Sequence, residues 1–360
     1  MSKAFDTVKR GELFKILENM VNKDELHMLK ILIENVQLRI RVGKETGEAF
    51  TTNIGVPQGD CLSPVLFILY LAEALKPLKS VAIPPHIEDH RYTRHSNALL
   101  MIDQQYADDI GWITNSEERK TQIRKEAAPT LGKKNLQVND TKTEEYTIKR
   151  NGDESWKECK YLGSLPDTEK DIQRRKILAM TAYNQLKQIF NNRKVSLQVK
   201  ARLVRSHIES VFLYNCELWT TTKKVEQSIN VFQRNILRSI LNIRWPDVIS
   251  NKDLYEKFNM IEWSKMVKRR RLNWYGHLLR LPEETPAKQA LREAERYVQK
   301  PAGGQKHTWL KQIERDLSRV KGKVTVINGD GTSNNWHNLA RNRHFWRVVV
   351  NRAMSEDDRA

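Results

Sequence analysis

The chain has 360 residues, with 62 lysines and arginines against 44 aspartates and glutamates, a formal net charge of +18, and only three cysteines. Such few, widely separated cysteines argue against a disulfide scaffold and favour a reducing, intracellular compartment, the nucleus or the cytoplasm. No apolar run is long enough to span a bilayer, no signal peptide is evident, and the positive surplus favours a polyanionic partner such as nucleic acid, although membrane-surface binding would give the same balance.

The first third of the chain predicts helices and then a hairpin. Residues 9–36 carry two helical patterns, and Asp6 stands where the N-cap of the first helix is expected. Residues 36–42 alternate between apolar and polar side chains, which predicts a half-buried strand. A turn containing Gly43 and Gly47 leads to a partner strand over residues 49–54, so these residues are expected to form a β-hairpin.

A glycine-rich loop follows the hairpin. It reads Gly55-Val56-Pro57-Gln58-Gly59-Asp60-Cys61-Leu62-Ser63-Pro64 and leads directly into an apolar, helix-like segment. Glycine allows a backbone to pass close to a ligand. Ser63 is expected to be the helix N-cap, with Pro64 in the first turn. The sequence of the loop alone would also suit an ordinary strand-to-helix turn.

A stretch rich in proline and histidine, residues 81–98, comes after the helix. His86, His90 and His95 raise the question of a zinc site. No cysteine lies nearby and the stretch contains prolines, so a connecting segment is favoured over a metal site.

Two adjacent carboxylates, Asp108 and Asp109, lie between the apolar runs 99–102 and 110–113. Runs of that length are typical of buried strands, which places the aspartates at or near the turn of a hairpin. Burying two like charges side by side is costly unless a cation meets them. The pair is therefore a candidate site for a hard cation such as Mg²⁺, with a solvated turn as the alternative.

Beyond the aspartates the chain becomes mostly helical. Residues 117–131 predict a charged helix, and two strands are expected around residues 136–138 and 146–148, with Lys142 between them. Past Gly163 an apolar stripe at helical spacing is formed by Ile172, Ile177, Met180, Tyr183, Leu186 and Ile189.

The most basic segment, residues 263–281, interleaves cations with Trp263, Trp274 and Tyr275. This composition suits phosphate contact combined with base stacking. At helical spacing, however, aromatic residues in the core with the basic residues facing solvent are favoured. The sequence Gly303-Gly304-Gln305-Lys306 predicts a linker before the last helices.

The order of these stretches resembles a reverse transcriptase of the non-LTR (LINE-type) retrotransposon class. The similar segments are Lys3–Val8 for the tail of motif A, Gly55–Phe67 for motif B, Tyr106–Asp109 for motif C, residues 136–143 for motif D and Lys160–Gly163 for the element that follows it. The resemblance implies an α+β fold in which an antiparallel polymerase palm carries helices on one face. It implies a partial palm over 1–165, thumb-like helices over 166–222, a basic helical region over 223–302 and a C-terminal helical segment over 303–360.

The resemblance also implies a chemistry and its residues. The family performs two-metal nucleotidyl transfer with Mg²⁺, using an RNA template, a DNA primer and deoxynucleotides. By similarity Asp108 is a direct metal ligand and Asp109 its helper, while Lys142, which on its own could be a surface lysine, protonates the departing pyrophosphate. The implied substrate contacts are Phe5 against the sugar, where it excludes a 2′-hydroxyl, Gln58 and Gly59 on the template side, and Tyr106.

One position of the family pattern falls outside the sequence. The first catalytic aspartate of motif A lies five residues before the aromatic that is Phe5 here, which is one position before Met1. The expectation is therefore an N-terminally truncated fragment without that aspartate, the fingers and the first palm strand, inactive or nearly so as a polymerase. The alternatives are a non-catalytic nucleic-acid-binding remnant and a truncated gene model of a decayed element.

Overall fold

The computed structural model describes residues 1, 4–34, 36–82, 103–114, 116–148, 154–298, 308–318, 320 and 336–355. The chain divides into two compact units, Met1–Glu144 and Glu145–Ala360. Helices dominate, accompanied by two small antiparallel sheets, which confirms a mixed α and β fold. None of the described helices combines the length and the apolar character that crossing a bilayer requires. The predicted linker, the three histidines and the apolar run 99–102 lie outside the described residues.

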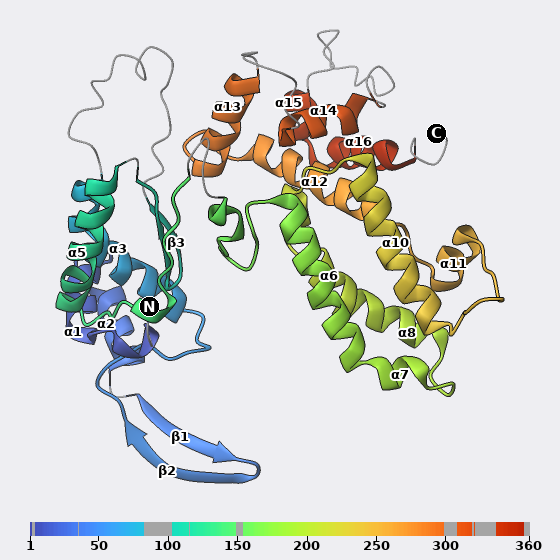
Figure 1. Cartoon of the computed structure of the whole chain (residues 1–360). Helices are drawn as coiled ribbons and strands as arrows, with labels where there is room; N and C mark the ends of the chain where they lie inside the picture. The colour runs from blue at the N-terminus through green and yellow to red at the C-terminus, as the bar shows by residue number, and fades with distance from the viewer. Residues whose placement is uncertain are drawn as a thin grey trace. The chain divides into compact units, whose positions relative to one another are not determined.

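The first unit consists of helices and two hairpins (Figure 1). Its elements are η1 (Phe5–Thr7), α1 (Arg10–Leu17), α2 (Lys23–Ile33), β1 (Gln37–Val42), β2 (Glu45–Thr51), α3 (Ser63–Ala82), β3 (Asp103–Tyr106), β4 (Asp109–Trp112), α5 (Glu117–Lys133) and η2 (Asp140–Lys142). The two sheets are the hairpins β1–β2 and β3–β4.

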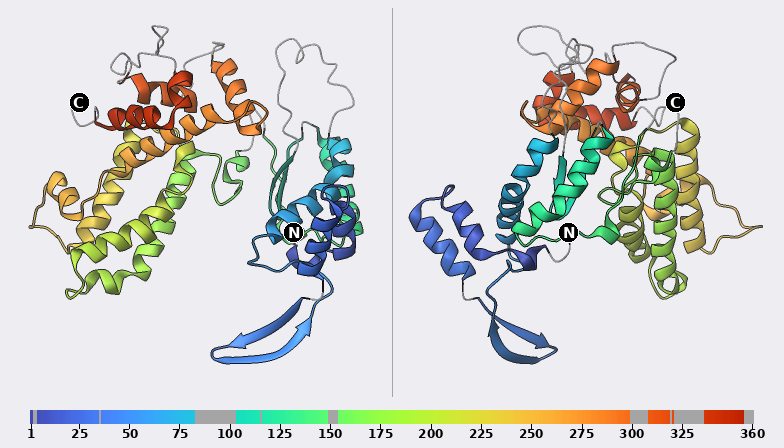
Figure 2. Two further views of the ribbon diagram at one scale, coloured as in Figure 1. Left: turned by 180° about the vertical axis from the view of Figure 1, so that it is seen from behind. Right: turned by 60° about the vertical axis from the view of Figure 1, so that its left-hand side comes forward.

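Helix α3 forms the centre of the first unit. Its mostly apolar sequence packs against α1 and α5, and α3 and α5 lie side by side in Figures 1 and 2. The Tyr70 hydroxyl, within this core, donates to the Lys134 carbonyl at 2.8 Å and lies 3.4 Å from the Lys9 amide. Burial raises the pKa of Tyr70 and keeps it neutral. The core side chains of α3 are Leu66, Phe67, Tyr70, Leu71, Ala74, Leu75 and Leu78.

The segment that contains Phe5 is joined to the glycine-rich loop by main-chain hydrogen bonds. The Gly55 amide donates to the Val8 carbonyl at 2.8 Å, and the Val56 amide donates to the Phe5 carbonyl at 2.9 Å. Arg10 reinforces this pairing because its Nε donates to the Gly55 carbonyl at 2.9 Å. Its guanidinium is buried, which lowers its pKa. The loop is therefore fixed to the beginning of the chain.

The hairpin β1–β2 extends away from the helices of its unit (Figures 1 and 2). Every residue of both strands is exposed, so the prediction of a half-buried strand is wrong. The turn is also tighter than expected: Gly43 and Lys44 alone connect the strands, and Gly47 lies within β2. Apolar alternation predicted the strand correctly but could not indicate whether another element covers it.

Two further local expectations fail. Asp6 does not cap α1, whose N-cap is Lys9, but lies inside η1. Residues 136–148 form no extended strand: Gln137 is a single β-bridge residue, and η2 occupies the middle of the range. Ile148 is 76% exposed, so the alternating pattern there has no core to pack against and no reason to form a strand.

The second unit is helical. Its elements are η3 (Ser155–Glu158), α6 (Thr168–Gln185), α7 (Lys187–Asn191), α8 (Leu197–Leu203), the π-helical turn η4 (Val204–Glu209), α9 (Ser210–Phe212), η5 (Cys216–Leu218), α10 (Lys223–Ile240), α11 (Asn251–Phe258), α12 (Trp263–Arg280), α13 (Pro286–Val298), α14 (Trp309–Ser318), α15 (Trp336–Arg341) and α16 (Arg343–Ser355).

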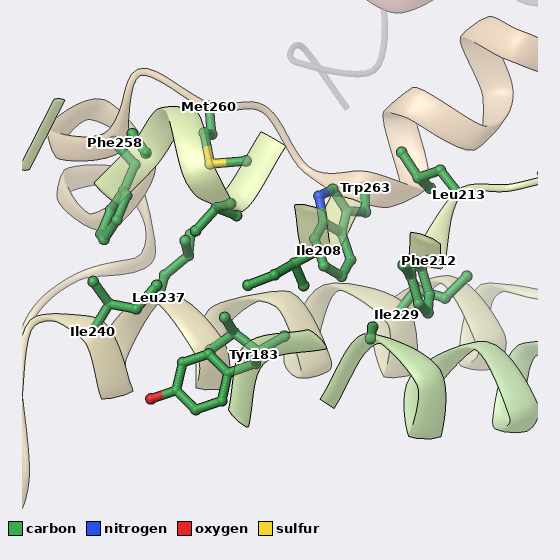
Figure 3. Close-up of a cluster of buried hydrophobic side chains, with 14 of the residues drawn as sticks. Tyr183, Ile208, Phe212, Leu213, Ile229, Leu237, Ile240, Phe258, Met260 and Trp263 are labelled. Carbon is green, nitrogen blue, oxygen red and sulfur yellow. The ribbon is translucent and has the colours of Figure 1, made fainter. Parts of the chain in front are cut away.

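One hydrophobic cluster joins α6 to the following helices as far as α12 (Figure 3). Phe212 and Trp263 stack at its centre, with ring centroids 4.7 Å apart. On α6 the predicted stripe is only partly right: Ile172 and Tyr183 are buried, whereas Ile177 is 68% exposed. The buried face of α6 instead contains Asp171 and Arg175, polar residues that a hydrophobic pattern cannot identify.

A chain of buried polar contacts crosses the second unit. Asp171 accepts from Trp219 Nε1 at 2.9 Å. Arg271 donates to the Trp219 carbonyl at 2.6 Å and to Asp316 Oδ2 at 2.8 Å, and Gln312 donates to the other oxygen of Asp316 at 3.1 Å. Each buried charge thus has an opposite charge or a hydrogen-bonding partner, which is the condition for its burial.

A second cluster packs α13–α16 against the C-terminal half of α12. The indole of Trp346 lies on Gly276 and donates from Nε1 to the Leu272 carbonyl at 2.9 Å. A Cβ at position 276 would lie 2.1 Å from Trp346 Nε1, so glycine is required where α16 meets α12.

Gly55→Ala should destabilise the first unit by about 2 kcal/mol or more. The φ of Gly55 is +81°, and a Cβ there would lie 2.9 Å from the Asp6 carbonyl oxygen. Gly11→Ala is the matched control because nothing lies within 4 Å of its Cβ position, and it should stabilise α1 by up to about 1 kcal/mol. Hydrogen exchange of the α1 and α3 amides in the full chain measures both changes. Equal destabilisation by Gly55→Ala and Gly11→Ala would contradict the requirement for glycine at position 55.

Gly276→Ala should destabilise the second unit by about 2 kcal/mol or more through overlap with Trp346. Trp346→Phe alone removes a hydrogen bond and apolar area, so it should also destabilise. Because the smaller ring relieves the overlap, the double variant should lose less than the sum of the two single losses. Urea unfolding followed by tryptophan fluorescence gives the three values, and strict additivity would show that the two residues do not meet.

Candidate functional site

The two aspartates of the candidate site lie at a hairpin turn, as the sequence predicted. Strands β3 and β4 pair antiparallel with Tyr106 opposite Asp109, which leaves Ala107 and Asp108 as the turn. Ala107 has a φ of +50° and Asp108 has no positive φ, the pattern of a type II′ turn. A non-glycine residue in that conformation is strained.

The carboxylates are solvated rather than buried. The Asp108 side chain is 46% exposed, and Asp109 is also exposed. This agrees with the alternative of a solvated turn, and the argument for a cation from the cost of burying like charges falls away. What remains is the chemical suitability of two adjacent carboxylates for a hard cation.

The beginning of the chain lies at this turn. The Met1 amino nitrogen donates to the Asp108 carbonyl at 3.1 Å and is 3.8 Å from Asp108 Oδ2. The positive amino group thus approaches the carboxylate that the sequence marks as a metal ligand. Met1 thus lies at the aspartate turn, whereas Phe5 and Val8 are bound to the glycine-rich loop.

Phe5 is brought to the motif B segment. Its ring stacks on Phe67 of α3, with centroids 4.7 Å apart, and its carbonyl accepts from Val56, two residues before Gln58. Gln58 and Gly59 are exposed, and Gly59 has a φ of +94° that favours glycine. Phe5 and the Gln58 loop therefore come together in the first unit.

Lys142 and Tyr106 are also solvent-exposed. Lys142 lies at the end of η2, which is stabilised locally by a hydrogen bond from Thr143 Oγ1 to the Asn139 carbonyl at 2.9 Å. In the described part of the chain, no hydrogen bond or ion pair connects Lys142 with Asp108. Tyr106 is 65% exposed beside the turn.

Ser63 does not have the predicted capping role. Its side chain is 1% exposed, and its Oγ makes no hydrogen bond although it is buried. The loop is stabilised instead by Asp60, whose Oδ1 accepts from the Leu62 amide at 3.1 Å. An unpaired buried hydroxyl costs about 1–3 kcal/mol, and here it lies at the start of the helix that follows Gln58.

Sequence reasoning missed the two ionic residues that organise the surroundings of the site. Arg10 is buried against the glycine-rich loop, and Glu12 lies 2.8 Å from Lys134. Lys134 and Lys15 together lower the pKa of Glu12 to about 2. Both residues look like ordinary surface positions of a helix, because the residues that bind Arg10, and Lys134 that binds Glu12, lie 42 or more residues away in sequence.

The carboxylates fit a magnesium site in donor type but not in number. Oxygen donors are what Mg²⁺ prefers, and two carboxylates with substrate phosphates are a common arrangement. Among the described residues, no group of three or more histidine, cysteine, aspartate or glutamate side chains is suited to holding a metal. Asp108 and Asp109 would therefore need further oxygen ligands.

The most basic helix, α12, uses its cations inside the protein. Trp263 and Tyr275 are in the core, as expected, but four basic side chains of the helix bind carbonyl oxygens rather than facing solvent. These are Lys268 to Ala353, Arg270 to Leu213, Arg271 to Trp219 and Arg280 to Ala340. The expectation that the basic residues face solvent is wrong for these four, because the α12 cations cap the ends of neighbouring helices and turns.

Residues 1–165 match the family model described as reverse transcriptase (RNA-dependent DNA polymerase). The match includes the first unit, with the aspartate turn, the Gln58 loop and Phe5. It ends before α6, so most of the second unit lies outside it. No curated protein matches the chain. The similarity to reverse transcriptases thus covers the first 165 of the 360 residues.

Ser63→Ala should stabilise the first unit by about 1 kcal/mol, because it removes a buried hydroxyl that has no partner. Ser116→Ala is the matched control. Ser116 caps α5 and its Oγ accepts from the Arg119 amide at 3.2 Å, so this change should destabilise by about 1 kcal/mol. Hydrogen exchange of the α3 and α5 amides distinguishes the two. If Ser63→Ala destabilised the first unit as much as Ser116→Ala does, Ser63 would be shown to cap α3.

Proposed function

We propose that the first 165 residues form the palm of a LINE-type reverse transcriptase, in which Asp108 and Asp109 hold Mg²⁺ for RNA-directed DNA synthesis. The family match and the motif order support the reaction type. The observation that carries the proposal is the pair of contacts made by Met1 and Phe5. Met1 donates to the Asp108 carbonyl and Phe5 accepts from the Val56 amide, so that residues close in sequence reach both the metal-binding candidates and the Gln58 loop.

The reaction would join a primer 3′-hydroxyl oxygen to the α-phosphorus of a deoxynucleotide as the bond to pyrophosphate breaks. When bound, the metal ions would stabilise the charge on the attacking and leaving oxygens. Asp108 would be the direct ligand, since its turn position gives its carboxylate freedom to approach a cation. Asp109, the first residue of β4, would support it.

The remaining candidates would select and position the substrates. The Phe5 ring, held against Phe67, is a bulky, rigid surface suited to excluding a 2′-hydroxyl. Gln58 and Gly59 would face the template, with the positive φ of Gly59 allowing close approach of the backbone. Tyr106 would contact the substrate beside the aspartates. Lys142 would protonate the pyrophosphate, which requires η2 to approach the turn when substrates bind.

Catalysis by these residues needs a third carboxylate. Asp108 and Asp109 supply too few oxygens to hold two ions, and the motif A aspartate corresponds to the position before Met1, whose amino group lies 3.8 Å from Asp108 Oδ2. A polypeptide of the printed residues should therefore polymerise little or not at all. Nucleic-acid binding without catalysis is the second candidate, and the formal net charge of +18 favours it.

Primer extension on an RNA template with Mg²⁺ tests the proposal. The printed chain should give little product, and a chain extended N-terminally with the fingers segment of a LINE-type reverse transcriptase and an aspartate directly before residue 1 should give at least about a hundredfold more. Asp108→Asn in the extended chain should abolish this gain. Robust synthesis by the printed chain would refute the requirement for the third carboxylate.

The matched control is Asp24→Asn, which removes one exposed carboxylate from the same unit on α2. It should leave extension by the long chain unchanged. No extension by the long chain, together with salt-sensitive RNA binding, would favour the non-catalytic candidate. Equal losses from Asp24→Asn and Asp108→Asn would contradict the role of the hairpin turn.

A further inference from the structure

The net positive charge of the chain belongs entirely to the second unit. Residues 1–144 contain 20 lysines and arginines and 20 aspartates and glutamates, whereas residues 145–360 contain the other 42 and 24. The difference in the second unit equals the whole formal charge of +18. A polyanion is therefore attracted to the helical unit, most of which lies outside the reverse transcriptase match.

Helix α16 carries cations that the protein does not use internally. Its sequence, Arg-His-Phe-Trp-Arg-Val-Val-Val-Asn-Arg-Ala-Met-Ser, contains three arginines and no acidic residue, and α15 contains none either. Arg343, Arg347 and Arg352 are exposed, and within the described part of the chain no carboxylate pairs with them. Glu356, Asp357 and Asp358 follow in the sequence and lie outside the described residues. The cations of α16 thus differ from those of α12, which are bound to carbonyl oxygens.

The orientation of α16 is fixed by its buried side. Trp346 lies against Gly276 and donates to the Leu272 carbonyl, while Val349, Val350 and Ala353 pack into the same core. At 100° per residue the opposite side carries Arg347 and Arg352, with His344 between them around the helix. Phe345, 41% exposed, lies two turns from Arg352 on one stripe. The outward side is therefore cationic with an accessible aromatic ring.

Arg343, the first residue of α16, also acts electrostatically on Arg280 of α12. Arg280 donates to the Ala340 carbonyl near the junction of α15 and α16. Burial, and then the positive charge of Arg343, lower its pKa. Like charges held close together are unfavourable unless an anion lies between or above them. A bound anion at this junction would remove that repulsion.

We propose that the exposed side chains of α16, Arg347 and Arg352 on its outward side, Phe345 beside Arg352 and Arg343 at its first residue, bind the phosphate backbone of nucleic acid. All three cations are arginines, whose planar fork binds phosphate oxygens in pairs. Phe345 offers a surface on which a base can stack. A membrane-binding helix needs a broad apolar face, whereas Phe345 and Val348 are the only large apolar side chains exposed on described α16. The proposal goes beyond polymerisation and does not require it.

Fluorescence anisotropy with a labelled 20-nucleotide single-stranded RNA and the full chain tests the proposal. The triple variant Arg343→Gln, Arg347→Gln, Arg352→Gln should weaken binding at least about tenfold near 0.1 M salt and reduce the slope of log K against log salt by about 2. Phe345→Ala should weaken binding about fivefold or more with the slope unchanged, since stacking releases no counterions. Near-UV circular dichroism of each variant verifies that Trp346 keeps its packing.

The matched control removes the same charge elsewhere on the second unit: Lys187→Gln, Arg193→Gln, Arg202→Gln. These cations are exposed on or near α7 and α8. The control should weaken binding less than about threefold. Equal weakening by both triple variants would show that diffuse charge binds RNA and would overturn the proposal, as would unchanged binding by the α16 variant. The proposal would also be overturned if the α16 triple variant lost binding to vesicles with 30% phosphatidylserine but kept the RNA affinity of the unsubstituted chain.

Discussion

The candidate site depends on a short piece of antiparallel pairing that is not part of any sheet. Two main-chain hydrogen bonds, from Gly55 to Val8 and from Val56 to Phe5, fasten the beginning of the chain to the loop before α3. Glycine is needed at position 55 because the backbone of Asp6 leaves no space for a Cβ. Arg10 then covers the pairing and satisfies carbonyl oxygens that burial would otherwise leave without donors. The position of Phe5 beside Phe67 follows from this pairing.

The second unit shows how a basic sequence can mislead. Its cations divide into two groups that composition does not separate. On α12 they bind carbonyl oxygens of neighbouring helices and pair with Asp316. They therefore stabilise the fold and are not available to bind a ligand. On α16 they face outward because Trp346 and the valines occupy the buried side. The distinction arises from which helix faces are covered.

Sequence analysis predicted the structure correctly where the local sequence pattern determines it. The aspartates at the β3–β4 turn, the helix after the Gln58 loop and the core positions of Trp263 and Tyr275 all follow from local pattern. It failed where a distant segment decides: the burial of Arg175 on α6, the unpaired Ser63 hydroxyl and the solvation of Asp108 depend on neighbours far away in sequence. The strand expected around residues 146–148 failed for the same reason, since Ile148 is 76% exposed, whereas Leu136 is buried in the core of the first unit. A pattern states which residues could be buried, and the tertiary packing determines whether they are.

The hairpin β1–β2 has a practical meaning that follows from its exposure. Since neither strand packs against a helix of its unit, the geometry of this ribbon rests on its ladder and its Gly43-Lys44 turn rather than on the core around α3. Its tip is therefore a natural grafting point. An epitope tag, a fluorophore or a few additional residues inserted between Gly43 and Lys44 would label the domain while leaving its interior and the Asp108 turn undisturbed.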